Sequence, residues 1–398
     1  MTHLPGVSGP ARAAVSAALV LLLLLTGCSG GGEKAEQADS PSSDRSSEAG
    51  PDEPGRLLSS EPYDGGAGAG VEAWRVRYRT TDARGEPREG TGLVVAPANP
   101  GDRGAVAAVA HPTVGMAQDC APSGPDRAQA TVASLSTLAE RGWVVVAPDY
   151  AGLGTPGGHD YLVGRAAAHD VLDAVRSGRE LVPEADEETV LWGHSQGGHA
   201  VLWAGAEASS YAPELEVSGV AATGVPTRLR EVVRRLEDTS TAALVSAFVV
   251  AAWDREYPRA GILEQVPEAS RPMVEKAAAG CLGGDEFASM YQLAKGLKGQ
   301  LLPEEAYDGR FGELLDRNSP TGRMEAPLFV GQSTQDAVVP RDVTRDWVSG
   351  VCEAGGEVRY REYPGGHSSV VASPATVNEL LTWMDDRVAG KPFEDDCG

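Results

Sequence analysis

The feature that most constrains this 398-residue chain is a Gly-x-Ser-x-Gly pentapeptide at Gly193–Gly197. It lies within the segment 192–198, which directly follows the β-branched run 188–191 and directly precedes the helix-prone segment 199–204. A serine on so tight a strand-to-helix turn adopts a strained backbone, and glycines two positions before and after it avoid Cβ clashes. The serine Oγ then projects above the sheet. The N-terminus of the following helix points at this reaction centre. This strand-to-helix context makes Ser195 the predicted nucleophile, with a purely structural turn as the alternative.

A serine nucleophile needs a base and an orienting acid, which in this strand–turn–helix context follow in the order acid, then histidine. The segment 326–331 has the pattern of a short buried strand, and Asp336 lies on the turn after it. The segment 357–363 has the pattern of the next strand and leads into His367. We therefore predict that His367 takes the serine proton and that Asp336 orients the imidazole. A loop aspartate that caps a turn or is simply solvated, and an ordinary loop histidine, are the alternatives.

The tetrahedral intermediate of such a reaction needs two backbone donors for its oxyanion. One predicted donor is the amide of Gln196, the residue after the nucleophile. The second is expected on the loop that follows the buried strand 105–110, where we favour the amide of Val114 or Gly115. An ordinary turn is the alternative there. A further strand at 143–147 ends at the same carboxyl edge of the sheet, where such sites lie.

Taken together, these motifs resemble the secretory lipase family over roughly residues 60–397. The resemblance rests on His-Pro-Thr at 111–113 with Cys-Ala-Pro-Ser at 120–123, Pro-Asp-Tyr-x-Gly-Leu-Gly at 148–154, Gly-His-Ser-Gln-Gly-Gly at 193–198 and Gly-Gly-His at 365–367.

That resemblance implies an α/β-hydrolase fold, in which helices flank a mostly parallel sheet and a helical cap is inserted. It also implies two disulfides and hydrolysis of carboxylic esters, and it places the triad on Ser195, Asp336 and His367. The fungal members carry an acidic residue in the oxyanion loop, where this chain has Thr113-Val-Gly115.

The N-terminal region has the pattern of an export signal. Arg12 precedes an apolar stretch at 13–25, which is too short to span a membrane comfortably. The stretch ends in Leu-Thr-Gly-Cys28, which resembles a bacterial lipobox, so we predict a signal peptide at 1–27 and lipidation of Cys28. An ordinary secretory signal is the alternative. Residues 28–56 are rich in Ser, Gly, Pro and acidic side chains and are predicted to form a disordered tether.

The remaining chain divides into a core at 57–225 and 322–398 and a helical cap or lid at 226–321. Helical patterns in the cap cover 228–237, 241–253, 272–279, 286–297 and 304–315. The second of these is apolar around most of its circumference, so it is either buried by packing or lines an apolar cavity. In the second case Phe248 and Trp253 would form an acyl pocket above the catalytic residues.

Five cysteines are an odd number for an exported protein unless one is lipidated. Without Cys28, the other four allow three pairings. Cys352 precedes the last strand and Cys397 is the penultimate residue, so a local bridge between them is reasonable. That bridge leaves Cys120, near the oxyanion loop, to pair with Cys281 in the cap. The family's pattern is similar, and four reduced cysteines are the alternative that export disfavours.

The formal net charge of −23 argues against binding to nucleic acid and against electrostatic attraction to anionic headgroups. His159, His194 and His199 lack tight metal-ligand spacing, so we expect no metal and no cofactor. The sequence predicts an exported, cell-surface, monomeric serine hydrolase of acyl esters or lipids. An acyltransferase or a peptidase with the same triad is the first alternative, and a solute-binding or adhesion lipoprotein is the second.

Overall fold

The computed structural model describes residues 52–236, 239–283, 287–297 and 301–398. The predicted signal peptide at 1–27, the lipidation residue Cys28 and most of the tether at 28–56 lie outside the described residues. Within the described ranges, no helix is both long enough and apolar enough to cross a membrane.

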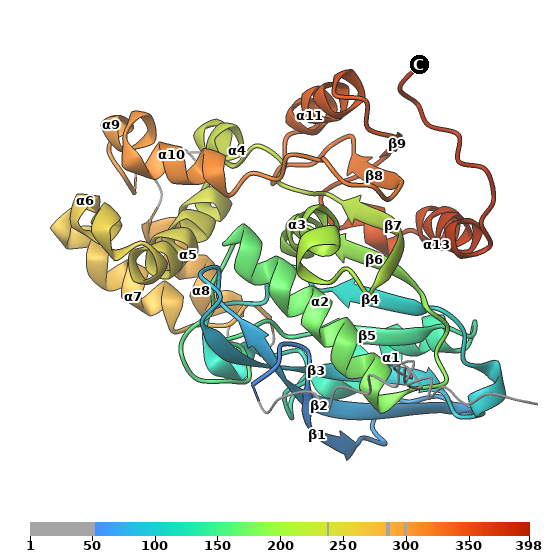
Figure 1. Ribbon diagram of the computed structural model, residues 1–398. Coiled ribbons are helices and arrows are strands. Elements are labelled where there is room, and N and C mark those ends of the chain that lie inside the picture. The colour runs from blue at the N-terminus through green and yellow to red at the C-terminus, as the bar shows by residue number, and fades with distance from the viewer. Residues whose placement is uncertain (1–51, 237–238, 284–286, 298–300) are drawn as a thin grey trace, which may run out of the picture. The chain divides into compact units, whose positions relative to one another are not determined.

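A nine-stranded sheet forms the centre of the fold, in the spatial order β1-β2-β3-β5-β4-β6-β7-β8-β9 (Figure 1). The strands are β1 (Leu57–Pro62), β2 (Val71–Thr81), β3 (Pro87–Pro97), β4 (Val106–Ala110), β5 (Val144–Pro148), β6 (Glu188–His194), β7 (Glu216–Thr223), β8 (Leu328–Ser333) and β9 (Val358–Tyr363). Strands β4 to β9 run parallel, and β1 to β3 add an antiparallel edge. The mostly parallel sheet is therefore confirmed, while the antiparallel edge has no counterpart in the sequence prediction.

The central parallel strands β4 and β5 are continuous apolar runs because helices cover both faces of the sheet. Every residue of β5 and of β8 is buried. On one face lie α2 (Gly164–Leu181), α3 (Gln196–Tyr211) and α11 (Arg341–Glu353). On the other face lie α1 (Ala128–Ala139) and α13 (Pro374–Val388), which follows the short α12 (Ser369–Ala372). The core is thus two apolar layers with the sheet between them.

Between β7 and β8 the chain leaves the sheet and builds the helical segment 226–321, which we call the cap. Its helices are α4 (Leu229–Leu236), α5 (Ser240–Glu256), α6 (Ile262–Gln265), α7 (Arg271–Ala278), α8 (Phe287–Gly296), α9 (Glu304–Asp308) and α10 (Arg310–Arg317). In Figure 1 they gather, yellow to orange, beside the carboxyl ends of the parallel strands. They share one apolar cluster with residues 161–163 of the core.

One cap helix predicted from the sequence is wrong. The segment 304–315 is not continuous, because the backbone of Gly309 has ψ −151° and separates α9 from α10. A Cβ at Gly312 would lie 1.8 Å from the carbonyl oxygen of Tyr307, so the two short helices meet too closely for a side chain there. The glycines thus fold this segment back on itself, which periodicity alone does not indicate.

Two disulfides are present, Cys120–Cys281 and Cys352–Cys397, and both pairings match the sequence prediction. The first joins the loop after β4 to the cap. The second ties the C-terminal segment to α11. In the chain-entropy model, closing loops of 161 and 45 residues stabilises the fold by about 5 and about 4 kcal/mol respectively.

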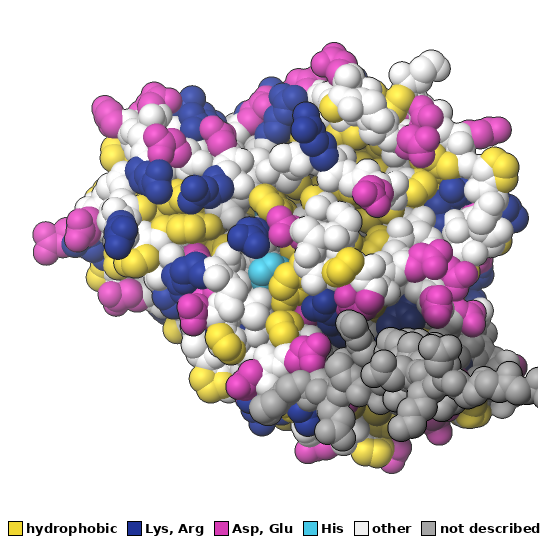
Figure 2. Space-filling model, in the orientation of Figure 1, with side chains coloured by type: hydrophobic (Ala, Val, Ile, Leu, Met, Phe, Trp, Pro, Cys, Tyr) yellow, Lys and Arg dark blue, Asp and Glu magenta, His cyan; other side chains and the backbone are white. Residues whose placement is uncertain are grey.

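Charged side chains of both signs are mixed on the face of the molecule shown in Figure 2. Asp and Glu side chains are interspersed there with Lys and Arg. Exposed ion pairs such as Arg310–Glu313 and Arg361–Glu379 each contribute little to stability.

Candidate active site

Ser195 lies on the turn between β6 and α3, and its backbone is strained. Its φ of 55° and ψ of −117° place a non-glycine residue in a sparsely populated region. The flanking glycines are required by close backbone approach. A Cβ at Gly193 would lie 2.1 Å from the carbonyl oxygen of Gly197, and a Cβ at Gly197 would lie 1.9 Å from that of Ala110. The pentapeptide therefore forms the sharp strand-to-helix turn that its sequence indicates.

Asp336 and His367 follow the adjacent strands β8 and β9 and meet above the sheet. His367 Nδ1 donates to Asp336 Oδ2 over 2.8 Å. The aspartate side chain is fully buried, whereas that of the histidine is 17% exposed. Because the two strands are parallel neighbours, residues on the loops after their carboxyl ends are brought together from 31 positions apart.

The Asp336 carboxylate is held in its ionised form. Burial by itself raises its pKa, but the hydrogen bond and charge of His367 act in the opposite direction. The backbone amides of Val338 and Val339 each donate to Oδ1 over 2.8 Å, and Gln332 Nε2 donates to Oδ2 over 3.0 Å. The net result is a pKa below the ordinary aspartate value. The carboxylate can therefore fix one imidazole tautomer and stabilise the imidazolium.

Ser195 and His367 line the same cavity, whose volume is about 430 Å³. The buried ring of His194 lies 4.8 Å from that of His367, and its Nδ1 is 3.0 Å from the carbonyl oxygen of Thr223. Burial, followed by the neighbouring His367, lowers the pKa of His194 to about 4. His194 is therefore neutral near pH 7 and supports the base sterically without competing for its proton.

Gln196 is the first residue of α3 and also lines the cavity. Its amide has no intrahelical acceptor, because the first N–H groups of a helix lie beyond the hydrogen-bond ladder. Its side-chain Nε2 lies 2.8 Å from Nε2 of His159. Burial lowers the pKa of His159 to about 3, so this imidazole is neutral and accepts the hydrogen bond. The backbone amide of Gln196 is thus without an intrahelical acceptor, and its side chain is held by the hydrogen bond to His159.

Val114 and Gly115, whose amides the sequence suggested as oxyanion donors, are not among the residues that line the cavity. The carbonyl oxygen of Val114 accepts from Leu282 N over 2.7 Å, and Gly115 forms a β-bridge with Cys281. This stretch therefore turns towards the cap and pairs with it. The cavity wall is formed instead by the two preceding residues, Pro112 and Thr113.

The cap supplies most of the apolar side of the cavity. From α4 and α5 the lining residues are Leu229, Val232, Val233, Leu236, Thr241, Ala242, Leu244, Val245 and Phe248. Phe248 is thus on the wall, as predicted, but Trp253 is not. Trp253 is five residues further along the helix, about 140° around its axis. It packs against Phe311 and donates from Nε1 to the carbonyl oxygen of Tyr161 over 3.0 Å.

Sequence reasoning placed the loop after the strand 143–147 at the carboxyl edge but did not identify His159, Tyr161 and Leu162 as the residues that this loop brings to the site. Its polar and aromatic residues follow a strand end at the carboxyl edge, which is the signal that was available. Across the described ranges, no group of three or more His, Cys, Asp or Glu side chains is arranged to hold a metal ion.

Comparison with known proteins agrees with this geometry. Residues 125–396 match the family described as secretory lipase. A secreted triacylglycerol lipase, LIP7, of Malassezia globosa is 25% identical over 381 residues, covering 86% of this chain and 78% of that protein. Lipase 9 of Candida albicans is 28% identical over 353 residues, covering 82% and 75%.

The solved structure of lipase A from Candida antarctica in its closed state is similar in fold, with a TM-score of 0.71 and 19% identity over 86% of this chain and 84% of that one. The chain therefore belongs to the secretory lipase family of carboxylic-ester hydrolases, with the α/β-hydrolase fold.

Proposed function

We propose that the chain cleaves carboxylic esters through an acyl-enzyme, with Ser195 as nucleophile, His367 as general base and acid, and Asp336 as orienting acid. The observation that carries this proposal is the buried Asp336–His367 hydrogen bond beside the cavity that Ser195 lines. The alternative of a solvated loop aspartate does not account for an acid that is fully buried and bonded to an imidazole.

The reaction follows from these positions. Ser195 Oγ attacks the ester carbonyl carbon while its proton passes to His367 Nε2, and the carbonyl oxygen becomes an oxyanion. The C–O bond to the alcohol then breaks, and His367 returns the proton to the leaving oxygen. Water repeats the sequence on the acyl-enzyme, releasing the carboxylic acid and regenerating Ser195.

For the oxyanion we propose the backbone amides of Gln196 and Thr113 as donors. Gln196 is the first helical residue after the nucleophile, and Thr113 lies on the cavity wall where Val114 and Gly115 do not. Removal of a single such donor typically lowers kcat by about 10²–10³.

We propose acyl esters of lipids as the substrates. The apolar side chains of α4 and α5 form a wall suited to an acyl chain, and a curated relative is named a triacylglycerol lipase. Rates on p-nitrophenyl esters from acetate to palmitate, with Ser195→Ala as control, test both the activity and the chain preference. A fluorophosphonate probe should label Ser195, and labelling that survives Ser195→Ala would contradict the assignment.

The same triad can serve an acyltransferase or a peptidase, and the product mixture separates these. With a competing alcohol present, a hydrolase releases mainly free acid, whereas an acyltransferase forms the new ester. A peptide amide that is cleaved as fast as the matched ester would favour a peptidase instead.

The family and the disulfides are consistent with export. We further propose that Cys28 carries a lipid anchor on the outer face of the cytoplasmic membrane and that the protein is monomeric. Cys28→Ser should release the protein from the membrane fraction while ester hydrolysis is retained, and an equal membrane-bound fraction in both proteins would contradict the anchor. Size-exclusion chromatography of the released protein tests the monomer.

A further inference from the structure

Two hydroxyl groups meet on the cavity wall. Thr113 Oγ1 lies 2.9 Å from the Tyr161 hydroxyl, and both residues line the cavity that contains Ser195. Among the described residues, neither hydroxyl has a second hydrogen-bond partner. Two hydroxyls joined by one hydrogen bond use only one of their two O–H protons. One O–H donor therefore remains unused on the wall of the cavity that Ser195 also lines.

The direction of this hydrogen bond follows from the two environments. Tyr161 is buried, and burial raises the pKa of its phenol to about 12, although the Thr113 contact acts in the opposite direction. The phenol is thus protonated at neutral pH and is a stronger donor than an aliphatic hydroxyl. Thr113 is only half-buried, on a loop at the open side of the pair. This contrast favours Tyr161 as the donor to Thr113 Oγ1, which leaves the threonine proton free.

Tyr161 is itself held tightly. Its ring lies 5.6 Å from that of Phe248 in the cap and 5.9 Å from that of His159, both edge-on. Its carbonyl oxygen accepts the indole N–H of Trp253 over 3.0 Å. The tyrosine is therefore fixed from both the core and the cap, so its hydroxyl has a defined position.

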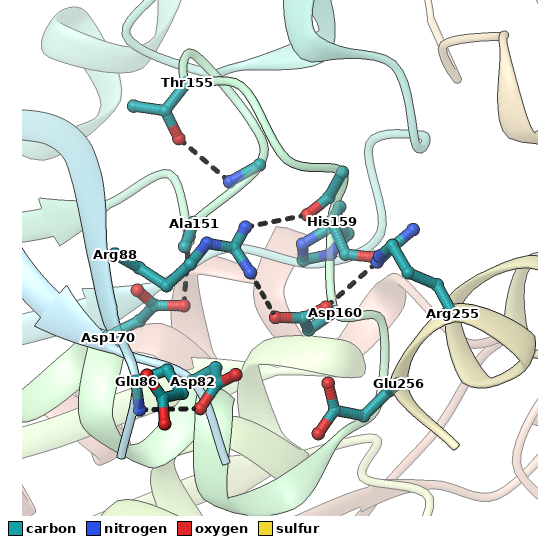
Figure 3. Close-up of polar contacts among 12 residues, drawn as sticks. Asp82, Glu86, Arg88, Ala151, Thr155, His159, Asp160, Asp170, Arg255 and Glu256 are labelled. Carbon is teal, nitrogen blue, oxygen red and sulfur yellow. Dashed lines mark hydrogen bonds and ion pairs between the residues drawn. The ribbon is translucent and has the colours of Figure 1, made fainter. Parts of the chain in front are cut away.

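The preceding residue, Asp160, anchors the same loop. Its nearly buried carboxylate binds Arg88 of β3 and Arg255 of α5, each over 2.9 Å (Figure 3). Arg88 also donates to the carbonyl oxygen of Gly158 over 2.9 Å, and Arg255 donates to that of His159 over 2.6 Å. One arginine comes from the core and the other from the cap, so the loop that presents Tyr161 is clamped between them.

We propose that the Thr113 hydroxyl is a third donor to the oxyanion, oriented by the hydrogen bond from Tyr161. Thr113 is then a catalytic residue through its side chain, and Tyr161 is a positioning residue. The inference rests on the proposed function of Ser195. The two backbone amides bind the oxyanion from fixed main-chain positions, and the threonine O–H adds a donor that costs no reorganisation because Tyr161 already occupies its acceptor site. The proton stays on Thr113 throughout.

The test compares Thr113→Val, Thr113→Ser and Tyr161→Phe with the unaltered chain on p-nitrophenyl butyrate. Thr113→Val should lower kcat by about 10²-fold with KM changed by less than about threefold, as expected for one lost oxyanion donor. Thr113→Ser should restore most of kcat, since it keeps the hydroxyl. Tyr161→Phe should lower kcat by about tenfold, because Thr113 loses its orientation but keeps its proton.

A second readout separates catalysis from folding. A trifluoromethyl ketone forms a tetrahedral adduct with the nucleophilic serine, whereas the matched methyl ketone mimics the ground state. In Thr113→Val the first should lose affinity in proportion to kcat/KM, and the second should not. Thr382→Val and Tyr291→Phe are matched controls on α13 and on exposed α8, and they should leave kcat and the melting temperature unchanged.

Three outcomes would overturn the inference. These are an unchanged kcat in Thr113→Val, an equal loss of affinity for both ketones, or a larger loss in Tyr161→Phe than in Thr113→Val, which would make the tyrosine the donor. Fluorophosphonate labelling of Ser195 in the unaltered chain distinguishes a failure of the Thr113 inference from a failure of the proposed function. If Ser195 is labelled, such a result overturns only the role of Thr113, whereas an unlabelled Ser195 overturns the proposed function as well.

Discussion

The core and the cap contribute to one cavity by different physical means. In the core, backbone geometry places the reactive groups: Ser195 N donates to the carbonyl oxygen of Thr223 over 2.8 Å, and Asp336 and His367 follow adjacent parallel strands. In the cap, apolar side chains of α4 and α5 fill space against one another and leave a wall. The positions of the candidate catalytic residues therefore depend on where strands end. The shape of the apolar cavity wall depends instead on which face of each cap helix is left unpacked.

The two regions are joined at the loop after β4, which carries the proposed oxyanion donor Thr113. Cys120–Cys281 and the β-bridge at Gly115 link it to the cap, and Arg255 of the cap binds Asp160 of the core. Changes in the core should therefore affect every substrate, whereas changes on the cap wall should affect long acyl chains first. The following substitutions are chosen to separate these effects.

The largest loss is expected from the core triad. His367→Ala should lower kcat by roughly 10⁴–10⁶ on all esters, and Asp336→Asn somewhat less, because it disturbs the tautomer without removing the base. Steady-state rates on acetate and palmitate esters measure this. A loss confined to one chain length would contradict a shared catalytic role.

The next largest effect is expected at the strand-to-helix turn that carries Ser195, where the core leaves no space for an added side chain. Gly197→Ala puts a Cβ 1.9 Å from the carbonyl oxygen of Ala110 and should destabilise the fold by more than about 4 kcal/mol. Gly350→Ala is the matched control in α11, because nothing lies within 4 Å of its Cβ, and it should gain up to about 1 kcal/mol. Urea unfolding measures both changes, and equal stabilities would argue against the clash.

A smaller and selective effect is expected on the cap wall. Val245 is half-buried and lines the cavity, so Val245→Asp should lower rates on palmitate by about 10–100-fold more than on acetate, because buried methylenes contribute about 0.8 kcal/mol each. Trp253→Ala should instead lower the free energy of unfolding by about 3–5 kcal/mol, since that side chain packs within the cap. It should lower the rates on all substrates together. Chain-length profiles and melting temperatures are measured on both. A uniform loss in Val245→Asp with a lowered melting temperature would sink the acyl-wall proposal.

The smallest effect is a pH dependence of core stability. Burial raises the pKa of Asp170 to about 8, above its unfolded value, so this group's contribution is full below about pH 4 and is lost as pH rises towards 8. In the unaltered chain Ala151 N donates to Asp170 Oδ2 over 3.0 Å. Asp170→Asn keeps an acceptor for this amide and removes the ionisable group. Its melting temperature should exceed that of the unaltered chain by a few degrees more at pH 8 than at pH 5. A constant difference across this range would contradict the raised pKa.

Much of the catalytic core was predictable because its signals are local. The glycines at 193 and 197, the strand patterns at 326–331 and 357–363, and the loop residues after them identify the candidate triad without tertiary information. Parallel strands bring their carboxyl ends to one edge, so chain order is enough to predict which loops meet. The sequence did not indicate that the chain turns towards the cap at Val114, since that turn depends on pairing of the neighbouring Gly115 with Cys281, far away in the sequence.

What the sequence by itself determined was the nucleophile turn, the order of the candidate acid and base, and the existence of a helical insertion, while it left the pairing of the cysteines open. Only the tertiary structure decided that Phe248 faces the cavity and Trp253 does not, and that Thr113 meets Tyr161. The physical reason is that a strand end or a glycine turn is specified by its own residues. The exposed face of an apolar helix, or the partner of a lone hydroxyl, is specified by whatever packs against it.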